Sequence, residues 1–555
     1  MQRRPARALG KLALGCAALA LSGAAAAQSA LDRAARATQG ESDRPTAPAT
    51  SVAPVPIDVA DDAAPPPAVS GEAPVAVGAI RLVGLQVLTP ADFSDILGDY
   101  VGKECSTADL QALATRLTQR ARARGYVLAS ATIAPQRLVA GVLAAYVDEG
   151  RIAHVRIEGS DRAALHAALD PLASGKPVTM AELERQLMLA SDIDGIAIRH
   201  TRYAREQGLG VLTVQVTADR VRGRVVVSND GTRPFGPEQV RIELAAGSLL
   251  AADDWVSFTL GSSFEPGEVA YAKLRYKLRV GASGTELALS GSFSATHPGS
   301  YLAPYDLVGH DAFFGVSMLK PLLRRRTHSM WLSAGLDLRD ARQWSHGIGI
   351  QRDRIVTARF GLYGYQRFAG GNLRYNALLT QGLPLFDASD TDLGASRWLA
   401  RDDFTAASVW ADWTRPLGGG FGVKLAGQVQ VASGPLFIAE QIGLGGGPFL
   451  RGYDYSERSG DEGVMGSAEL QYSLLASDAG AVRRAQIYAF VDGGRVEYLG
   501  GGCCGGALAS GGGGLRADLA HGLGATLEVA VPMTGPRYDT GHADPKVNVA
   551  IAKSF

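Results

Sequence analysis

Residues 271–280 read Tyr-Ala-Lys-Leu-Arg-Tyr-Lys-Leu-Arg-Val, so apolar and charged side chains alternate along this stretch. Successive side chains of a β-strand point to opposite faces of its sheet, which gives a strand here one face of each kind. Its apolar face comprises Ala272, Leu274, Tyr276, Leu278 and Val280, and its polar face comprises Tyr271, Lys273, Arg275, Lys277 and Arg279. One face therefore suits lipid and the other suits water.

The same alternation returns in the residues after 217. In 421–432 the apolar face comprises Phe421, Val423, Leu425, Val429 and Val431, and the opposite face comprises Gly422, Lys424, Gln428 and Gln430. The region after 217 also holds 34 of the 39 aromatic residues and 51 of the 68 glycines. The composition therefore changes near residue 217, and a second structural class begins there.

The N-terminus carries a secretory signal peptide, residues 1–27. Four cationic residues precede an apolar run over 12–21, and small residues lead to a cleavage site after Ala27. A soluble β-sandwich also alternates, but a long series of strands in an exported chain, with no apolar stretch long enough for a spanning helix, favours a transmembrane β-barrel. Cleavage removes 4 of 55 basic residues and leaves 51 against 55 acidic ones, which does not favour nucleic-acid binding.

The length of the C-terminal region predicts the number of strands. Residues 218–555 number 338, and outer-membrane barrels use roughly 20 residues per strand with its turns and loops. The quotient is about 17, and the nearest even count is about 16 antiparallel strands. The chain ends in an alternating strand with a terminal Phe555, which resembles the assembly signal of outer-membrane barrels, although Lys553 interrupts the apolar register.

Residues 28–76 predict a flexible linker. They contain eight prolines among alanine, aspartate and serine, and no aromatic residue. Residues 30–39 could form a short helix, although about ten residues are marginal for a helix in water. A disordered segment is the alternative at this position.

Residues 77–217 read as two successive α+β units, a first unit at 77–151 and a second unit at 152–217. Each has the element order β-α-α-β-β over about seventy residues. Each contains a helix with a capping box, at Ser106 in the first unit and at Thr179 in the second, because an acidic residue follows three positions later. Two generic small α+β domains would fit these residues equally well.

Short motifs in the first unit resemble those of a known family. A Gly-Tyr pair follows the long helix, a Pro-Gln step follows the next strand, and a Val-x-Glu-Gly turn closes the unit. The motif residues are Gly125, Tyr126, Pro135, Gln136, Glu149 and Gly150. This pattern resembles the first POTRA domain of the two-partner secretion transporters, the haemolysin secretion/activation (ShlB/FhaC/HecB) family, and the second unit fits that family's second POTRA domain more loosely.

Two motifs in the barrel region resemble the same family. Leu450-Arg451-Gly452-Tyr453 is similar to its Val-Arg-Gly-Tyr signature on a long loop that folds into the lumen, with leucine in place of valine. Phe490-Val491-Asp492-Gly493 resembles its Phe-x-Asp-Gly pattern on an inner strand. The resemblance implies that Arg451 and Asp492 form a salt bridge that locks the loop in the barrel. The supporting motif positions are Glu440, Gly445, Gly446, Phe490 and Gly493.

Without the family, these motifs are compatible with ordinary turns. The physical case for a pair is that an arginine leaving water needs a carboxylate, and that breaking a buried pair costs about 3–5 kcal/mol.

The resemblance implies a mainly β fold, with a 16-stranded transmembrane antiparallel barrel at 218–555 behind two periplasmic α+β POTRA domains. It implies a position in the outer membrane of a Gram-negative bacterium. It implies transport, without ATP, of an unfolded exoprotein of adhesin or haemolysin type that carries an N-terminal secretion domain. Outer-membrane lipid and, during biogenesis, the barrel-assembly machinery are the further partners expected. Family members place a plug helix in the barrel, and only residues 30–39 could serve here.

Enzymatic activity is not expected. The sequence has no Gly-x-Ser-x-Gly or His-Glu-x-x-His motif, no phosphate loop and no cluster among its nine histidines, so we expect no cofactor and no metal. Cys503 and Cys504 lie in a glycine-rich run over 500–514, for which we expect an exposed loop. The polar face of 271–280 suggests a basic lumen wall, or only a generic polar lumen. A barrel-assembly insertase and a passive porin are the alternative functions.

Overall fold

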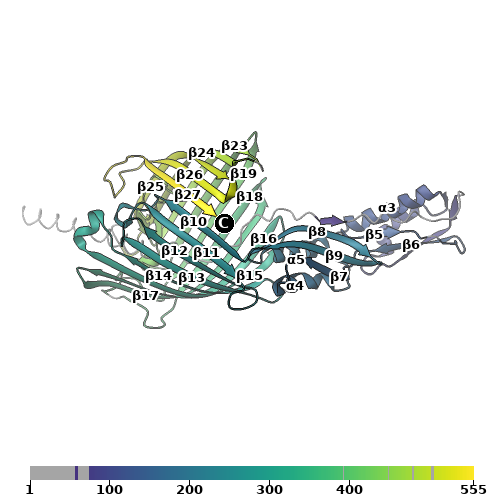
Figure 1. The fold of residues 1–555 in the computed structure, drawn as a ribbon, viewed down its shortest axis with the longest axis horizontal. Helices are drawn as coiled ribbons and strands as arrows, with labels where there is room; N and C mark the ends of the chain where they lie inside the picture. Colours follow the sequence, from purple (N-terminus) through teal and green to yellow (C-terminus); the bar gives the residue numbers. More distant parts are fainter. Residues whose placement is uncertain are drawn as a thin grey trace, which may run out of the picture.

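The computed structural model describes residues 57–59, 74–134, 136–391, 393–447, 449–477, 480–501 and 505–555. A closed β-barrel forms one end of the molecule, and the two α+β units extend from it in a row (Figure 1). The expected signal peptide and the candidate helix at 30–39 lie outside the described residues. The same holds for Pro135, Cys503 and Cys504.

Sixteen antiparallel strands of the described chain form the barrel, each paired with its neighbours in sequence order. This confirms the fold class expected from the alternation. The strands are β10 Val221–Ser228, β11 Gln239–Gly247, β12 Asp254–Ser263, β13 Val269–Val280, β14 Thr285–Thr296, β15 Leu307–Arg324, β16 His328–Ser345, β17 Ile348–Phe368, β18 Gly371–Gly382, β19 Thr405–Gly418, β20 Phe421–Ala432, β23 Glu462–Ala476, β24 Val482–Glu497, β25 Gly506–Leu519, β26 Leu523–Pro532 and β27 Lys546–Ser554.

The first and last strands close the barrel. β10 pairs with β27 from Arg224 opposite Ser554 onwards. The terminal Phe555 and Gly223 each donate a backbone hydrogen bond to the other, at 2.9 Å in both directions. The Phe555 ring lies where a Cβ on Gly223 would stand, so glycine makes room for the aromatic terminus.

The outward positions of the strands carry the apolar side chains. On β13, Leu274 is 51% exposed, and on β20, Leu425 and Val429 are 45% and 41% exposed. These residues alternate with polar neighbours that face the lumen, such as Gln428, which lines a cavity inside the barrel. A surface of exposed leucine, valine and phenylalanine is what a strand needs against hydrocarbon.

The prediction of an exposed loop over 500–514 was wrong for residues 506–514, which belong to strand β25. The reason is close packing against the aromatic rings of β24. A Cβ on Gly512 would lie 2.9 Å from the Phe490 ring, and one on Gly514 would lie 2.5 Å from the Tyr488 hydroxyl. Glycine here makes space for two rings inside the barrel.

The first unit packs one long helix against a small sheet in the order β3-β6-β5. The Ser106 side chain accepts the Asp109 N–H at the start of α3, as the capping box predicts. Cys105 is a buried free cysteine in this unit. Its elements are β2 Val75–Val77, β3 Ala79–Val83, η1 Pro90–Phe93, α2 Ser94–Gly98, β4 Lys103–Cys105, α3 Thr107–Ala123, β5 Ser130–Thr132 and β6 Val142–Asp148.

The second unit has the order β-α-α-β-β and lies beside the barrel, whereas the first unit adds β2 before that order and β4 between its two helices. Its sheet has the order β1-β8-β9-β7, and helices α4 and α5 cover one face. Its elements are β7 His154–Glu158, α4 Ala163–Leu169, η2 Asp170–Ala173, α5 Met180–Ser191, β8 Ile196–Glu206 and β9 Leu209–Ala218. The added strand β1, Ile57–Val59, comes from the expected linker, where the sequence predicted no strand.

Buried charges connect the second unit to the barrel. Arg324 of β15 forms a bidentate ion pair with Asp192, at 2.6 and 2.7 Å, and its side chain is fully buried. Lys277 pairs with Asp194 at 2.5 Å, and Arg279 donates to the backbone of the second unit. Two of the four basic residues expected in a lumen wall therefore serve this junction.

In the part of the chain that the structure describes, no helix is long and apolar enough to cross a membrane.

A charge on the lipid face should destabilise the barrel, whereas the same side chain on the adjacent lumen position should not. We expect Leu425→Arg to lower the free energy of unfolding in lipid vesicles by about 2–4 kcal/mol, because arginine then faces hydrocarbon. Lys424→Arg is the matched control, since Lys424 already carries a charge beside Asp412. Equal losses in the two variants, measured by urea titration, would contradict the assignment of the faces.

Candidate functional site

The loop between β20 and β23 lies inside the barrel and is called the lumen loop (residues 433–461). Its described part contains a short turn of helix, η5 Ile438–Glu440, and a two-stranded hairpin, β21 Ile442–Leu444 and β22 Arg458–Gly460. Apolar side chains of the hairpin and its tip are buried with side chains of β23, β24 and β25. The loop therefore packs against the wall as part of the core.

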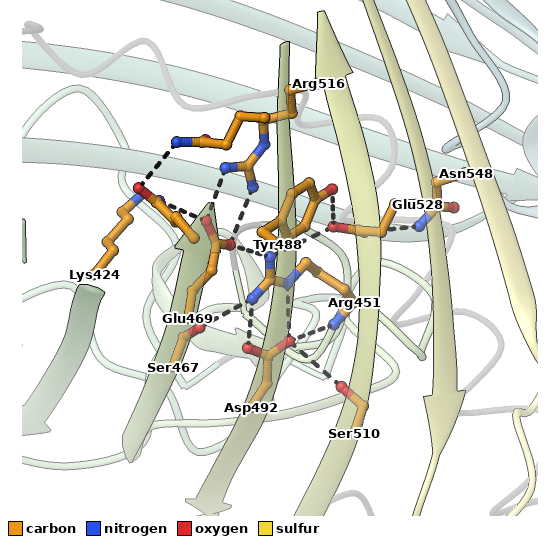
Figure 2. A network of polar contacts seen from close by, with 12 residues as sticks. Lys424, Arg451, Ser467, Glu469, Tyr488, Asp492, Ser510, Arg516, Glu528 and Asn548 are labelled. Atoms are coloured by element: carbon orange, nitrogen blue, oxygen red, sulfur yellow. Dashed lines mark hydrogen bonds and ion pairs between the residues drawn. The ribbon is translucent and has the colours of Figure 1, made fainter. Parts of the chain in front are cut away.

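Arg451, near the tip of this loop, is enclosed by carboxylates of the barrel wall (Figure 2). Its guanidinium donates twice to Asp492 of β24, through Nε at 3.1 Å and Nη2 at 3.0 Å. Nη1 donates to Glu469 of β23 at 2.8 Å and lies 3.4 Å from Glu528 of β26. Arg451 is 7% exposed and Asp492 is 1% exposed, so the pair is shielded from water.

The structure thus brings Arg451 and Asp492 together, and it adds two carboxylates that the sequence did not single out. Glu469 also binds Arg516, at 2.7 and 3.0 Å. Two guanidinium groups and three carboxylates give this cluster a formal charge of −1. Tyr488 donates to Glu528 at 2.9 Å, and Ser510 Oγ lies 3.5 Å from Asp492. Each of the three carboxylates therefore has a charged or polar partner besides Arg451.

Aromatic rings support the two guanidinium groups. The Arg451 guanidinium carbon lies 3.4 Å from the centroid of the Phe490 ring, and that of Arg516 lies 3.7 Å from the Tyr488 ring. Cation–π contacts of this kind contribute more when water is excluded. The motif residue Phe490 therefore supports Arg451 directly, and the glycines of β25 make room for its ring.

The neighbours of Arg451 fit tightly against the wall. A Cβ on Gly452 would lie 2.9 Å from the side chain of Ser510 and from the backbone of Val531, so only glycine allows this approach. Tyr453 is fully buried, and its hydroxyl lies 3.0 Å from Thr534 Oγ1. Leu450 adopts φ 60°, a left-handed conformation that a β-branched valine would tolerate less well.

The supporting motif residues have separate structural roles. Glu440 does not reach Arg451, because it accepts a hydrogen bond from Arg359 of β17 at 2.6 Å. Gly445 and Gly446 adopt positive φ in the turn after β21. Gly493 has no close neighbour that excludes a side chain, whereas a Cβ on Gly494 would lie 2.8 Å from Leu444.

Asp461 is a further buried carboxylate that sequence reasoning missed. It lies at the end of the lumen loop and accepts hydrogen bonds from the backbone of Leu436 and Leu499, and from the side chains of Gln441 and Arg397. It joins both ends of the lumen loop. The strand alternation could not reveal it, because Asp461 lies outside a barrel strand.

The motif residues of the first unit lie far from this cluster along the chain and stabilise a local corner. Glu149 is buried and accepts the backbone N–H groups of Gln86, Val87 and Leu88 at 2.6–3.1 Å. The Gln136 side chain donates a hydrogen bond to the carbonyl of Ala144 at 2.7 Å and accepts one from its N–H at 2.9 Å. It thus pairs with β6 as the backbone of a neighbouring strand would.

Two glycines join the first unit to the second. The carbonyl groups of Gly125 and Gly150 accept the backbone N–H groups of Met180 and Val178, at 2.9 and 3.1 Å. A side chain on Gly150 would collide with Leu128. Beside this joint, burial raises the pKa of the Tyr126 phenol, and the nearby Glu149 carboxylate adds to the shift. The glycines of the two motifs therefore hold the second unit, while Glu149 stabilises the first unit, and the ion pair of Arg205 with Asp148 adds to the contact.

Comparison with known proteins gives the family. Residues 211–517 match the model of the haemolysin secretion/activation protein family ShlB/FhaC/HecB, and residues 75–150 match the ShlB-type POTRA domain. The chain belongs to this family. Both findings confirm the resemblance read from the motifs, and they identify an outer-membrane β-barrel transporter with a periplasmic POTRA domain, not an enzyme.

Individual members of the family are similar over most of the chain. The outer membrane transporter CdiB of Escherichia coli is 25% identical over 414 residues, which cover 72% of this chain and 69% of that protein. The heme/hemopexin transporter protein HuxB of Haemophilus influenzae is 22% identical over 408 residues, 70% of each chain. The solved structure of CdiB from E. coli superposes with a TM-score of 0.69 at 22% identity, covering 95% of this chain and 98% of that one.

Removing the arginine should harm this transporter's stability more than removing the whole pair. We expect Arg451→Met to lower the free energy of unfolding by about 3–5 kcal/mol, because Asp492 then stays buried with no cation. The double variant Arg451→Met, Asp492→Asn should recover part of that loss, because it removes the unpaired charge.

Urea unfolding of the four proteins, including Asp492→Asn alone, measures this coupling. Arg495→Met is a control on the same strand, since Arg495 pairs with Glu497 in solvent. A double variant as unstable as the sum of the singles would contradict the account.

Proposed function

We propose that this protein exports one large exoprotein in two-partner secretion. Its two units act as POTRA domains at 77–151 and 152–217, behind a linker at 28–76, and they bind the client in the periplasm. The client then crosses the barrel at 218–555 in an unfolded state and folds outside. The relatives named as transporters support a transport role, and the family description supports a client of haemolysin type. An adhesin is the other client type we propose, and in either case the client would carry an N-terminal secretion domain.

The observation that carries this proposal is the occupied lumen. The lumen loop packs beside β24, and two cavities lined in part by Arg451 measure about 560 and 250 Å³. Each of these cavities has at most the volume that suits a small molecule, and neither could hold a folded domain. A client would therefore cross as an extended chain, after a movement of the loop.

Arg451 and Asp492 are the residues we propose as the lock of this loop. The buried bidentate pair holds the tip against β24, and the second carboxylate Glu469 holds the same guanidinium from β23. The lock would secure the loop at rest and let it be displaced only by a bound client. Transport would draw on client binding and folding, since the sequence has no phosphate loop that could bind ATP.

An insertase for outer-membrane proteins is the second candidate. The solved structure of BamA from Haemophilus ducreyi shares the fold at a TM-score of 0.51 and 12% identity. A likeness at that level concerns the fold alone. In this chain the β10–β27 seam carries five paired positions as well as the terminal pairing of Phe555 with Gly223. The seam is shorter than the ladders of eight or more paired positions at the other junctions, but it still completes the ring of strands, and a completed ring favours a closed pore over lateral release of nascent strands.

Deletion of the gene should identify the client. We expect mass spectrometry of the culture medium to show the loss of one large protein, while the outer-membrane proteins stay unchanged. Complementation with the parent gene should restore secretion. Complementation with Arg451→Ala should restore the barrel in the membrane but leave the large protein inside the cells.

Other outcomes decide between the functions. A broad loss of barrel proteins from the outer membrane would indicate an insertase. If the proteins of the culture medium and of the outer membrane both stay unchanged, a passive pore remains as the function to test. Normal secretion by Arg451→Ala would show that the arginine does not lock the transporter.

A further inference from the structure

The outer face of β16 changes from apolar to charged toward its extracellular end. Its outward side chains from 330 to 338 are all apolar, and Leu336 among them is 57% exposed. A strand crosses the hydrocarbon of a bilayer with about 9–11 residues, so this run spans it. The next two outward residues are Asp340 and Arg342. β16 begins beside Arg324, which pairs with the periplasmic second unit, so these two charges lie at the level of the outer leaflet.

Three guanidinium groups surround Asp340. Arg342 donates to it from Nε at 2.6 Å and from Nη2 at 3.1 Å. From β17, Arg352 donates at 2.8 Å and Arg354 donates at 3.2 and 3.3 Å. Three positive charges and one negative charge leave a formal charge of +2. The described residues place one further carboxylate within ion-pair distance of these arginines, the fully exposed Asp387, at 3.9 Å from Arg354. The cluster stays positive with Asp387 counted.

The strand register adds an unfavourable contact between two of these arginines. Arg342 lies directly opposite Arg352 in the β16–β17 ladder. Like charges at directly opposite positions destabilise a sheet. A guanidinium group has five N–H donors, and one carboxylate cannot accept from all the donors of three such groups. The side chains of Arg342 and Arg352 are 47% and 48% exposed, so an anion from outside the chain can reach both and stabilise them.

The cluster lies among aromatic side chains. Trp344, the next outward residue of β16, lies against His310 of β15, with ring centroids 5.1 Å apart. Tryptophan is enriched where lipid meets water, which agrees with a position at the membrane surface. Arg354 also donates to the carbonyl of Phe386 at 3.1 Å, and the Phe386 side chain is 71% exposed. These surroundings suit an amphipathic ligand with an anionic head and apolar chains.

β24 has the same division of its outer face without the excess of charge. Its outward positions from 485 to 493 carry no polar side chain, and Arg495 and Glu497 follow toward the extracellular end. These two side chains pair with each other at 2.8 Å and leave no net charge. The positive cluster on β16 and β17 is therefore a distinct feature of that side of the barrel.

We propose that Arg342, Arg352 and Arg354 bind the phosphate groups of lipopolysaccharide, the phosphorylated glycolipid of the outer leaflet. Each guanidinium group can hold a phosphate through two parallel hydrogen bonds. Asp340 keeps the three side chains together, and the acyl chains of the lipid lie along the apolar band beneath them. A soluble phosphate compound would match the arginines but would leave that apolar band unused. The inference concerns the lipid boundary of the barrel and holds whichever protein is transported.

A titration with lipid A, the phosphorylated lipid part of lipopolysaccharide, tests the proposal. The protein is the full chain in detergent, and native mass spectrometry measures the bound lipid. We expect the double variant Arg342→Gln, Arg352→Gln to bind lipid A with two phosphates about 25-fold more weakly than the parent, since each arginine near an anionic lipid contributes about fivefold. The parent should also prefer this lipid over the form with one phosphate, and the double variant should lose that preference.

Arg495→Gln is the matched control, because it removes one exposed arginine at the same end of the barrel. We expect it to bind lipid A like the parent. Equal binding by the parent and the double variant would overturn the proposal. An equal loss in Arg495→Gln and in Arg352→Gln alone would also overturn it, because the effect would then be that of any surface charge.

A measurement of stability separates a binding role from a structural one. Without lipid A, we expect Arg352→Gln to be at least as stable as the parent in a urea titration, because the change removes the like-charge pair with Arg342. With lipid A the parent should gain stability, and the variant should gain less. A loss of stability without lipid, together with an equal gain in both proteins with lipid, would show that Arg352 only supports the fold.

Inorganic phosphate distinguishes the lipid from a free anion. We expect millimolar phosphate to leave lipid A bound to the parent, because the acyl chains contribute to binding along the apolar band. Displacement of the lipid by phosphate would make the cluster a site for soluble anions and would overturn the assignment to lipopolysaccharide.

Discussion

The buried guanidinium of Arg451 is the interaction on which the interior of this barrel depends. An arginine inside a protein is tolerated only when its charge is matched, and here carboxylates from three wall strands meet it. Its position is therefore set by the wall, and the interior of the pore is filled as long as the cluster stays intact.

The rest of the barrel accommodates this cluster. Phe490 and Tyr488 on β24 lie against the two guanidinium groups, and their rings need a neighbouring strand without side chains at the positions they cover. The glycines of β25 leave this space free, since any side chain at Gly512 or Gly514 would collide with the rings or with the backbone of β26. The high glycine content of this strand, which in the sequence suggests an irregular loop, thus allows close packing. At the periplasmic end, Arg324 and Asp192 repeat the same principle of a fully buried, bidentate pair.

The sequence predicted the barrel because alternation is a local property of each strand, visible in ten residues such as 271–280. It predicted the meeting of Arg451 with Asp492 because both lie in motifs whose order resembles one family. It did not predict Glu469 or Glu528, because alternation gives the face of a residue but not its partner across the lumen. Composition was misleading at 506–514, where the decisive neighbours lie on another strand.

The strand β1 also shows that a local sequence pattern does not reveal pairing with a distant strand. Prolines on either side of residues 57–59 favour a linker, and only the register with β8 reveals a strand. The capping boxes at Ser106 and Thr179 were predicted because a cap and its acidic partner are three residues apart. Contacts between distant segments, including the junction of Arg324 with Asp192, depend on the assembled fold.

The central claim is that a polypeptide passes through the lumen beside the Arg451 loop. Photo-crosslinking in growing cells tests it most directly, with a photoreactive amino acid at Gln428, which lines the lumen, or at Val429, which faces lipid. The account predicts adducts between position 428 and one exoprotein, and none at position 429. Adducts with nascent outer-membrane barrel proteins, or no protein adduct at 428 during active secretion, would contradict it.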